Sequence, residues 1–343
     1  DFARAEICCR EALTQAPGQP MLYYNLGIAL LRQERPAEAR AAFQTAVDLR
    51  PDYPEALTGL GDASFRAGEF NDAVRFYRKS LSIAGNQPQT FHNLALAVLQ
   101  TADQSNAEQY FEQATALAPA METAWIGWSR FLLGKGNSGR AIVILEKAIS
   151  QLPDSADLRY QHGYAKHHAG RYEEAMTSFG HCLGLVSRHR DALFARSMLL
   201  RQLGRLSDAM QDLRALIETD PRDARAHAGL AGLYKDEGRI NDALAHGRKA
   251  VELDPGNAEF HGNLIMNMHY GEGVAPSEVF DAHRAWGLAH AASAHRSTRL
   301  VNSPDPERAL RIGYFSPDFK EHSVAYFIAP ILAHHNRARC TVF

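Results

Sequence analysis

His322 is one of the few residues of this sequence whose type and setting suit catalysis. It follows LRIGYFSPDF, a short apolar run that ends in Gly, Ser, Pro and Asp and is typical of a buried strand with its turn. A His after such a turn lies at the carboxyl edge of a sheet, where α/β proteins bind ligands, and a neutral imidazole accepts a proton near pH 7. The alternative is that His322 only caps or packs against the start of the next helix.

The remaining histidines do not form a recognisable metal site. The sequence holds 16 His, and the adjacent pairs His167–His168 and His334–His335 place their members on different helix faces. Neither an HExxH motif nor a carboxylate at ligand spacing is present. We therefore predict that the chain holds no metal.

Composition and charge exclude several classes of protein. The 343 residues include 37 Lys and Arg against 39 Asp and Glu, so the formal net charge is −2 and no positive excess is available for nucleic acid. No apolar run reaches the roughly 18 residues that a membrane-spanning helix needs. The four cysteines include no CxxC pair, which favours a reducing, cytoplasmic compartment.

The sequence repeats itself with a period of 34 residues. Alanine recurs eight times at this spacing, at Ala5, Ala39, Ala73, Ala107, Ala141, Ala175, Ala209 and Ala243. Twelve residues after each of these alanines, six of the eight positions are proline, and the exceptions are Gly85 and Ser187. Two further columns hold small residues (such as Gly27) and glycines (such as Gly68). Such a register indicates an array of identical structural units.

Each unit is predicted to be a pair of helices. In residues 20–53 the segment MLYYNLGIALLRQ places Tyr23, Leu26 and Leu30 on one helical face, and AEARAAFQTAVDL places Ala39 and Phe43 on another. The small residues let the two helices approach closely, and Phe43 is expected to fill the space that they leave. The glycine column ends the first helix in a left-handed conformation, and the proline column prevents extension of the second.

These repeats resemble the tetratricopeptide repeat. The resemblance covers about residues 1–257, as half a repeat followed by seven repeats that begin at Pro20, Pro54, Pro88, Glu122, Ala156, Arg190 and Ala224. It implies a mostly α fold, a right-handed α-solenoid with a concave groove, because each helix pair leaves an apolar side that only the next pair can cover. A start in the middle of a repeat suggests a piece of a longer protein.

The register fails after residue 257, and the pattern then changes twice. Residues 258–296 are predicted to hold a divergent repeat and connecting helices, and residues 297–309 form a polar linker. In residues 310–343 an apolar run, a helical segment and a second apolar run follow one another. This order is typical of the opening of a doubly wound α/β domain.

Three blocks at this junction resemble the protein O-GlcNAc transferase/SPINDLY family of glycosyltransferases. They are NLIMNMHYGEGVAPSEVFDAHRAWGLAHA, LRIGYFSPDFKEHSVAYF, and APIL leading to CTVF. The resemblance implies an inverting enzyme with two Rossmann-like lobes (GT-B), which transfers sugar from UDP-GlcNAc or GDP-fucose to Ser or Thr hydroxyls of proteins. It implies no permanently bound cofactor, because the nucleotide sugar is a substrate.

The same resemblance assigns candidate site residues. The DFxxH block places His322 in the active-site cleft, with Asp318 as its neighbour near the substrates. The second lobe and the pyrophosphate site of such an enzyme would lie beyond Phe343, so residues 310–343 would be a truncated start of the N-terminal catalytic lobe. We therefore expect this chain alone to be inactive.

A column of first-helix residues is the candidate substrate-binding surface. In the O-GlcNAc branch of the family, Asn side chains at this column hold the backbone of an extended protein substrate. Here the column keeps asparagine in three of its eight repeats: Asn25, Asn93 and Asn263. The alternative is that these are exposed polar residues on a solvated surface.

Two functions remain open from the sequence. The first is a protein O-linked glycosyltransferase whose solenoid selects protein or peptide substrates. The second is a non-catalytic repeat scaffold for protein–protein interaction. Neither involves nucleic acid or a membrane, and both are compatible with an oligomer.

Overall fold

The computed structural model describes residues 1–291, 310–314, 323–336 and 339–342. The chain divides into two compact units, Asp1–Trp286 and Gly287–Phe343. The first unit is entirely helical in its described part, which confirms the mostly α class expected from the repeat pattern.

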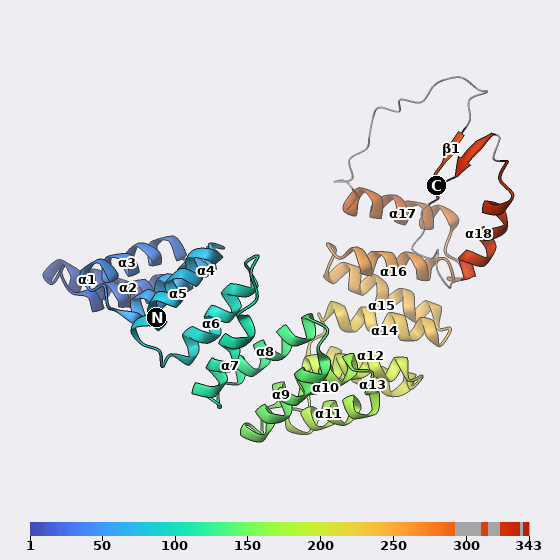
Figure 1. Cartoon of the computed structure of the whole chain (residues 1–343). Coiled ribbons are helices and arrows are strands. Elements are labelled where there is room, and N and C mark those ends of the chain that lie inside the picture. Colours follow the sequence, from blue (N-terminus) through green and yellow to red (C-terminus); the bar gives the residue numbers. More distant parts are fainter. Residues whose placement is uncertain (292–309, 315–322, 337–338, 343) are drawn as a thin grey trace. The chain divides into compact units, whose positions relative to one another are not determined.

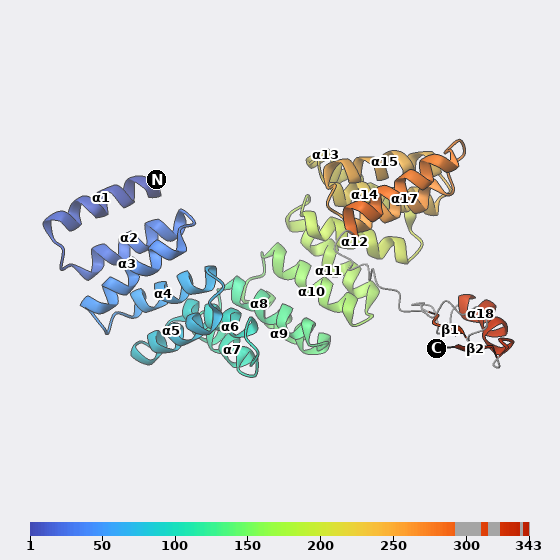
Figure 2. The same ribbon diagram turned by 90° about the horizontal axis from the view of Figure 1, so that it is seen from above.

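Helices follow one another in antiparallel pairs along the first unit (Figures 1 and 2). The first nine are α1 (Phe2–Gln15), α2 (Pro20–Arg32), α3 (Pro36–Leu49), α4 (Pro54–Arg66), α5 (Phe70–Ile83), α6 (Pro88–Leu99), α7 (Ala107–Leu117), α8 (Glu122–Gly134) and α9 (Ser138–Gln151). The next eight are α10 (Ala156–His168), α11 (Tyr172–Leu185), α12 (Arg190–Gln202), α13 (Leu206–Thr219), α14 (Ala224–Asp236), α15 (Ile240–Leu253), α16 (Ala258–Met268) and α17 (Pro276–His290).

Local sequence sets where these helices begin and end. Proline occupies the first turn of α2, α3, α4 and α6, where its missing N–H and fixed φ cost nothing. The turn between the two helices of a pair needs a left-handed residue, and Gly68 takes it with φ of 78°. Glu34 occupies the same position in the preceding pair with φ of 59°.

The expected packing of small residues against large ones is present between the pair α2–α3 and the following helix α4. Phe43 is fully buried, and a β-carbon added at Gly27 or Gly59 would lie 2.6 Å from its ring. One phenylalanine of α3 therefore fills the space left by glycines of α2 and α4. The core continues along the unit in this way, because each first helix packs on its own partner and on the next first helix.

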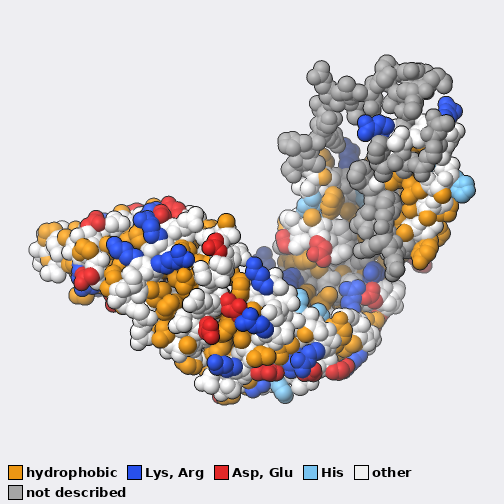
Figure 3. Space-filling model, in the orientation of Figure 1, with side chains coloured by type: hydrophobic (Ala, Val, Ile, Leu, Met, Phe, Trp, Pro, Cys, Tyr) orange, Lys and Arg blue, Asp and Glu red, His pale blue; other side chains and the backbone are white. Residues whose placement is uncertain are grey.

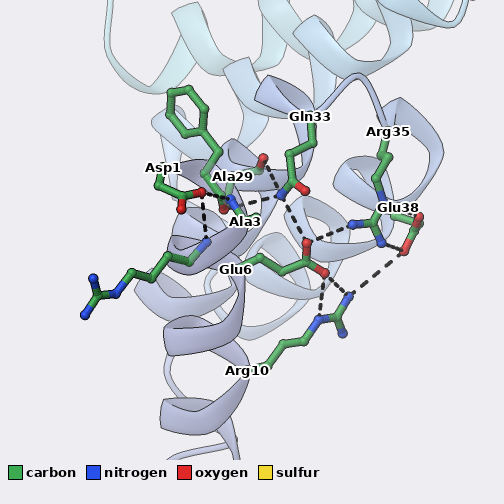
Figure 4. A network of polar contacts seen from close by, with 10 residues as sticks. Asp1, Ala3, Glu6, Arg10, Ala29, Gln33, Arg35 and Glu38 are labelled. Carbon is green, nitrogen blue, oxygen red and sulfur yellow. Dashed lines mark hydrogen bonds and ion pairs between the residues drawn. The ribbon is translucent and has the colours of Figure 1, made fainter.

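The first helix, α1, is attached to the α2–α3 turn by a polar network (Figure 4). Glu6 accepts hydrogen bonds from Arg10 on α1 and from Gln33 at 3.0 Å, and Arg35 lies 2.8 Å from the same carboxylate. The hydrogen bonds from Arg10 and Gln33 hold the pKa of Glu6 below its usual value. Arg35 also pairs with Glu38, so the network reaches α3.

The second unit contains β1 (Leu310–Ile312), α18 (Ser323–Ala333) and β2 (Cys340–Val342) in its described part. The strands are parallel, and Leu310 pairs with Cys340. A strand, a helix and a parallel strand in this order agree with the pattern expected for residues 310–343. Two strands and one helix do not make a Rossmann-like lobe, so that part of the fold stays a prediction.

Charged side chains of both signs are interspersed over the face of the first unit that Figure 3 shows. This distribution matches the near-neutral net charge of −2. None of the helices in the described segments is long and apolar enough to cross a membrane.

Candidate functional site

Two cavities lie where neighbouring first helices of successive pairs meet. The N-terminal cavity, of about 350 Å³, lies between α2, α4 and α6, with one side chain from α5. Its lining consists of Ile28, Leu31, Arg32, Asp62, Phe65, Arg66, Tyr77, Asn93 and Leu96. The C-terminal cavity, of about 500 Å³, lies between α12, α14, α15 and α16. Both have the size of common ligand pockets.

The polar centre of the N-terminal cavity is the carboxylate of Asp62. Its Oδ1 accepts hydrogen bonds from the hydroxyl of Tyr77 at 2.6 Å and from Nδ2 of Asn93 at 2.9 Å. These two bonds fix the carboxylate between three helices, because Tyr77 lies on α5 and Asn93 on α6. Asp62 Oδ2 takes part in no hydrogen bond with the described residues, so it can accept one from a ligand.

Burial controls the ionisation of this centre. It raises the pKa of Asp62, against the opposing hydrogen bonds of Tyr77 and Asn93 and the charges of Arg66 and Arg32. Burial and the neighbouring Asp62 likewise raise the pKa of the Tyr77 hydroxyl. The site therefore presents a half-buried acceptor beside apolar side chains such as Ile28, which suits a donor group on an amphipathic ligand.

Two cations line the C-terminal cavity, Arg201 from α12 and Lys235 from α14. Arg201 Nε donates to Asp236 Oδ2 at 2.6 Å, and Lys235 Nζ lies 3.5 Å from the other oxygen of that carboxylate. Burial alone would raise the pKa of Asp236, but the hydrogen bonds and charges of Arg201 and Lys235 together outweigh it and lower that pKa. The guanidinium lies against α14 at Gly232, where an added β-carbon would be 3.0 Å from Nη1.

The α16 side of the C-terminal cavity carries amide and apolar groups. Asn263 and Asn267 are one helical turn apart and share a face of the helix. Asn263 is exposed, whereas Asn267 is only 3% exposed. The other lining residues are Ala228, Ala231, Gly232, Ile240, Gly247, Ala250, Phe260, Leu264, Met266 and Tyr270.

The structure brings two of the sequence-predicted residues to cavities. Asn93 lines the N-terminal cavity and Asn263 the C-terminal one, whereas the exposed Asn25 lines neither. His322 and Asp318 lie outside the described residues, so their assignment to a sugar-transfer site stays a prediction. In the described segments, no group of three or more His, Cys, Asp or Glu side chains could hold a metal ion.

Sequence reasoning missed Asp62, Arg201, Lys235 and Asn267. One usable signal was present: Arg201 and Lys235 occupy the same position in successive repeats, 34 residues apart. Asn267 could have been found from its spacing of four residues after Asn263. Asp62 gave no such signal, because its partners come from other helices.

Models of the tetratricopeptide repeat match residues 24–88, 88–121, 156–185 and 187–258. Together these matches cover more than half of the chain. A structure of a tetratricopeptide repeat protein from Parabacteroides merdae has a similar fold, with a TM-score of 0.56 and 16% sequence identity. The match covers 73% of this chain and 98% of that one.

Among curated proteins, the chain is similar to a probable UDP-N-acetylglucosamine–peptide N-acetylglucosaminyltransferase, SPINDLY, of Arabidopsis thaliana. The two are 40% identical over 80 residues, which is 23% of this chain and 9% of that protein. The SPINDLY protein of Petunia hybrida matches to the same extent, 40% over 80 residues. The chain thus spans less than a tenth of the length of these relatives.

Proposed function

Because the chain belongs to the tetratricopeptide-repeat family, we propose that its first helices bind a polypeptide segment of partner proteins. The observation that carries this proposal is the pair of cavities between neighbouring first helices. In each of them intramolecular bonds hold a charged group in place: Tyr77 and Asn93 hold Asp62, and Asp236 holds Arg201. Groups fixed before binding lose little entropy when a ligand arrives.

An array of randomised short synthetic peptides, probed with the purified chain, tests this proposal. We expect a subset of peptides to bind, and the substitution Asp62→Asn to weaken part of that subset by about tenfold or more. The substitution is isosteric and keeps an oxygen for Tyr77 and Asn93. Lys79→Ala, at an exposed position on α5 outside both cavities, is the matched control. Absence of any peptide binding would contradict the proposal.

We further propose that this chain is the substrate-binding part of a protein O-linked glycosyltransferase that uses UDP-GlcNAc or GDP-fucose. The 40% identity to SPINDLY over 80 residues supports it. The order of strand, helix and parallel strand in residues 310–342 is compatible with the start of a catalytic lobe. In this proposal His322 lies in the active site with Asp318 beside it, and the solenoid selects the acceptor protein.

The test uses the full-length gene product, incubated separately with each nucleotide sugar and assayed for donor hydrolysis and for modified protein. We expect turnover with one donor and its loss in His322→Ala. Full turnover of His322→Ala would remove the site assignment. No turnover with either donor would contradict the glycosyltransferase proposal. Polypeptide binding by a repeat scaffold would then remain, and the peptide array tests it independently.

A further inference from the structure

Two histidines face each other where α16 meets α17. His269 caps the C-terminal end of α16, and His283 lies within α17. Both residues belong to the first unit, and both side chains are exposed. Their Nε2 atoms are 3.1 Å apart, which is the distance of a hydrogen bond between the two rings. Neither proposed function uses this pair.

The protons of the two rings determine what the pair can bind. A hydrogen bond between neutral imidazoles needs one protonated and one unprotonated Nε2, so one lone pair already points at the other ring. The donor ring can carry its proton on Nδ1 instead, which is the other neutral tautomer. Both Nε2 atoms then present lone pairs to the same point, and neither the number of protons nor the charge has changed.

The separation of the two nitrogens suits a single transition-metal ion. Two ligands of a tetrahedral Zn²⁺ with Zn–N bonds of about 2.0–2.1 Å are about 3.3–3.4 Å apart, and adjacent ligands of a square-planar ion are about 2.8–3.0 Å apart. The observed 3.1 Å lies between these values. The ring planes are inclined by 60°, so the rings do not stack. Because both side chains are exposed, a small rotation adjusts the distance and an ion can enter from solvent.

A second pair of histidines shows what the site must avoid. Nδ1 of His227 lies 3.0 Å from Nδ1 of His246, but His227 is buried. Burial lowers the pKa of His246, and the charge of Arg214 acts in the same direction. The same positive charge would repel a metal ion. The exposed pair of His269 and His283 is therefore the better candidate.

We propose that His269 and His283 bind one divalent transition-metal ion, such as Zn²⁺, through their Nε2 atoms, and that the ion fastens α17 to α16. Water completes the coordination. Structural zinc sites have four protein ligands, so an ion held by two is bound more weakly and exchanges with solvent. The inference is independent of polypeptide binding. It departs from the absence of metal predicted from the sequence, because the two ligands come from different helices.

The attachment of α17 explains what such an ion would change. The helix has no buried side chain. Its contacts with neighbouring helices include an exposed ion pair between Arg248 and Glu278 at 3.0 Å and a hydrogen bond from Trp286 Nε1 to the carbonyl of Ala258 at 3.0 Å. Exposed ion pairs contribute little stability. An ion that needs ligands from both helices binds only the docked arrangement and therefore stabilises it.

Isothermal titration calorimetry of the metal-free chain with ZnCl₂ measures the binding. We expect a site that His269→Ala and His283→Ala each weaken, with Kd raised by about tenfold or more. Mg²⁺ should not bind there, because it prefers oxygen ligands. His181→Ala, at an exposed position on α11, is the matched control and should bind Zn²⁺ as the wild type does.

Two further measurements examine the bridge between the helices. Electron paramagnetic resonance of the Cu²⁺-loaded chain should show hyperfine coupling to two imidazole nitrogens, and to one in either single variant. In hydrogen exchange measured by mass spectrometry, Zn²⁺ should slow exchange in α16 and α17 and leave α2 and α4 unchanged. The single variants should lose this protection. Circular dichroism verifies that each variant is folded.

Three results would overturn the inference. Zn²⁺ binding that is unchanged when both His269→Ala and His283→Ala are present would remove the site. Coupling of Cu²⁺ to a single nitrogen in the wild type would remove the bridge between the helices. Zn²⁺ binding without protection of α17 would show that the ion does not fasten this helix.

Discussion

Glu34 is held in a left-handed conformation that suits glycine better. Its φ is 59°, and the equivalent residue of the next pair, Gly68, has φ of 78°. A side chain in this region costs roughly 1 kcal/mol. We expect Glu34→Gly to raise the free energy of unfolding by about 1 kcal/mol, measured by urea denaturation. Gly68→Ala should lower it by a similar amount, because the added β-carbon meets open space but adopts the strained φ. Destabilisation by Glu34→Gly would contradict this account.

Small residues also leave room for large side chains between neighbouring helices, and the contact of Gly59 with Phe43 is an example. A β-carbon at Gly59 would lie 2.6 Å from the buried ring, and Phe43 is enclosed by α2 and α4. We expect Gly59→Ala to destabilise the chain by about 1–3 kcal/mol, as overpacking does. Gly180→Ala on α11 is the control, because nothing lies within 4 Å of its added β-carbon. It should stabilise the helix by about 0.5–1 kcal/mol.

Residues such as these were predictable because the repeat places them in columns. The period of 34 indicated that Gly27 and Ala39 must be small and that Phe43 fills the gap. The column did not predict that Phe43 also touches Gly59 of the following pair, since that contact depends on how two pairs stack. Asp62 escaped prediction for the same reason.

At the scale of helices, buried histidines make folding sensitive to acid. Burial, with help from Lys166 and against Glu146, lowers the pKa of His162 on α10 to about 4. Burial also lowers the pKa of His92 on α6 and of His246 on α15. In the unfolded chain these side chains take up protons near pH 6.5, whereas the folded chain resists protonation.

Stability should therefore be highest above pH 6.5 and should fall as pH drops toward 4, because the unfolded state then binds more protons. We expect the urea midpoint to decrease between pH 7 and pH 5. His162→Gln should make this decrease smaller, and His181→Gln, at an exposed position on α11, should not. An unchanged pH dependence in His162→Gln would contradict the role of this residue.

Helices were predictable to a degree that cavities were not. Proline at the first turn and glycine in the turn between helices fixed where α2 and α4 begin and where α4 ends. A cavity needs side chains from three or four helices that meet at one point, as Asp62, Tyr77 and Asn93 do. The sequence predicted only the asparagine column as a binding surface. Of its three asparagines, Asn93 and Asn263 line a cavity and Asn25 does not.

At the scale of the whole chain, the two proposed functions depend on different segments. The repeats carry the described cavities, and the proposed chemistry rests on His322 and Asp318, which lie outside the described residues. Peptide binding and sugar transfer are therefore separable: Asp62→Asn examines the first, and His322→Ala examines the second. A repeat scaffold and a substrate-selecting solenoid would share the first property.

The repeat architecture also predicts how far a destabilising core substitution affects other helices of the first unit. Each helix pair contacts mainly its neighbours, so stability is a sum of local terms and unfolding need not involve all pairs together. Leu145 on α9 is fully buried in a cluster with Trp125, Leu132 and Leu158. Truncating such a leucine costs roughly 2–5 kcal/mol.

We expect Leu145→Ala to accelerate amide hydrogen exchange in α8, α9 and α10, measured by mass spectrometry, and to leave α2 and α4 unchanged. The core of α2 and α4 belongs to a separate cluster that includes Leu30 and Leu57, so it loses no contact. Val143→Ala, on the same helix but 64% exposed, should change exchange little anywhere. A uniform increase across the unit would instead mean that the pairs unfold as one cooperative block, and that nearest-neighbour coupling is stronger than the local terms.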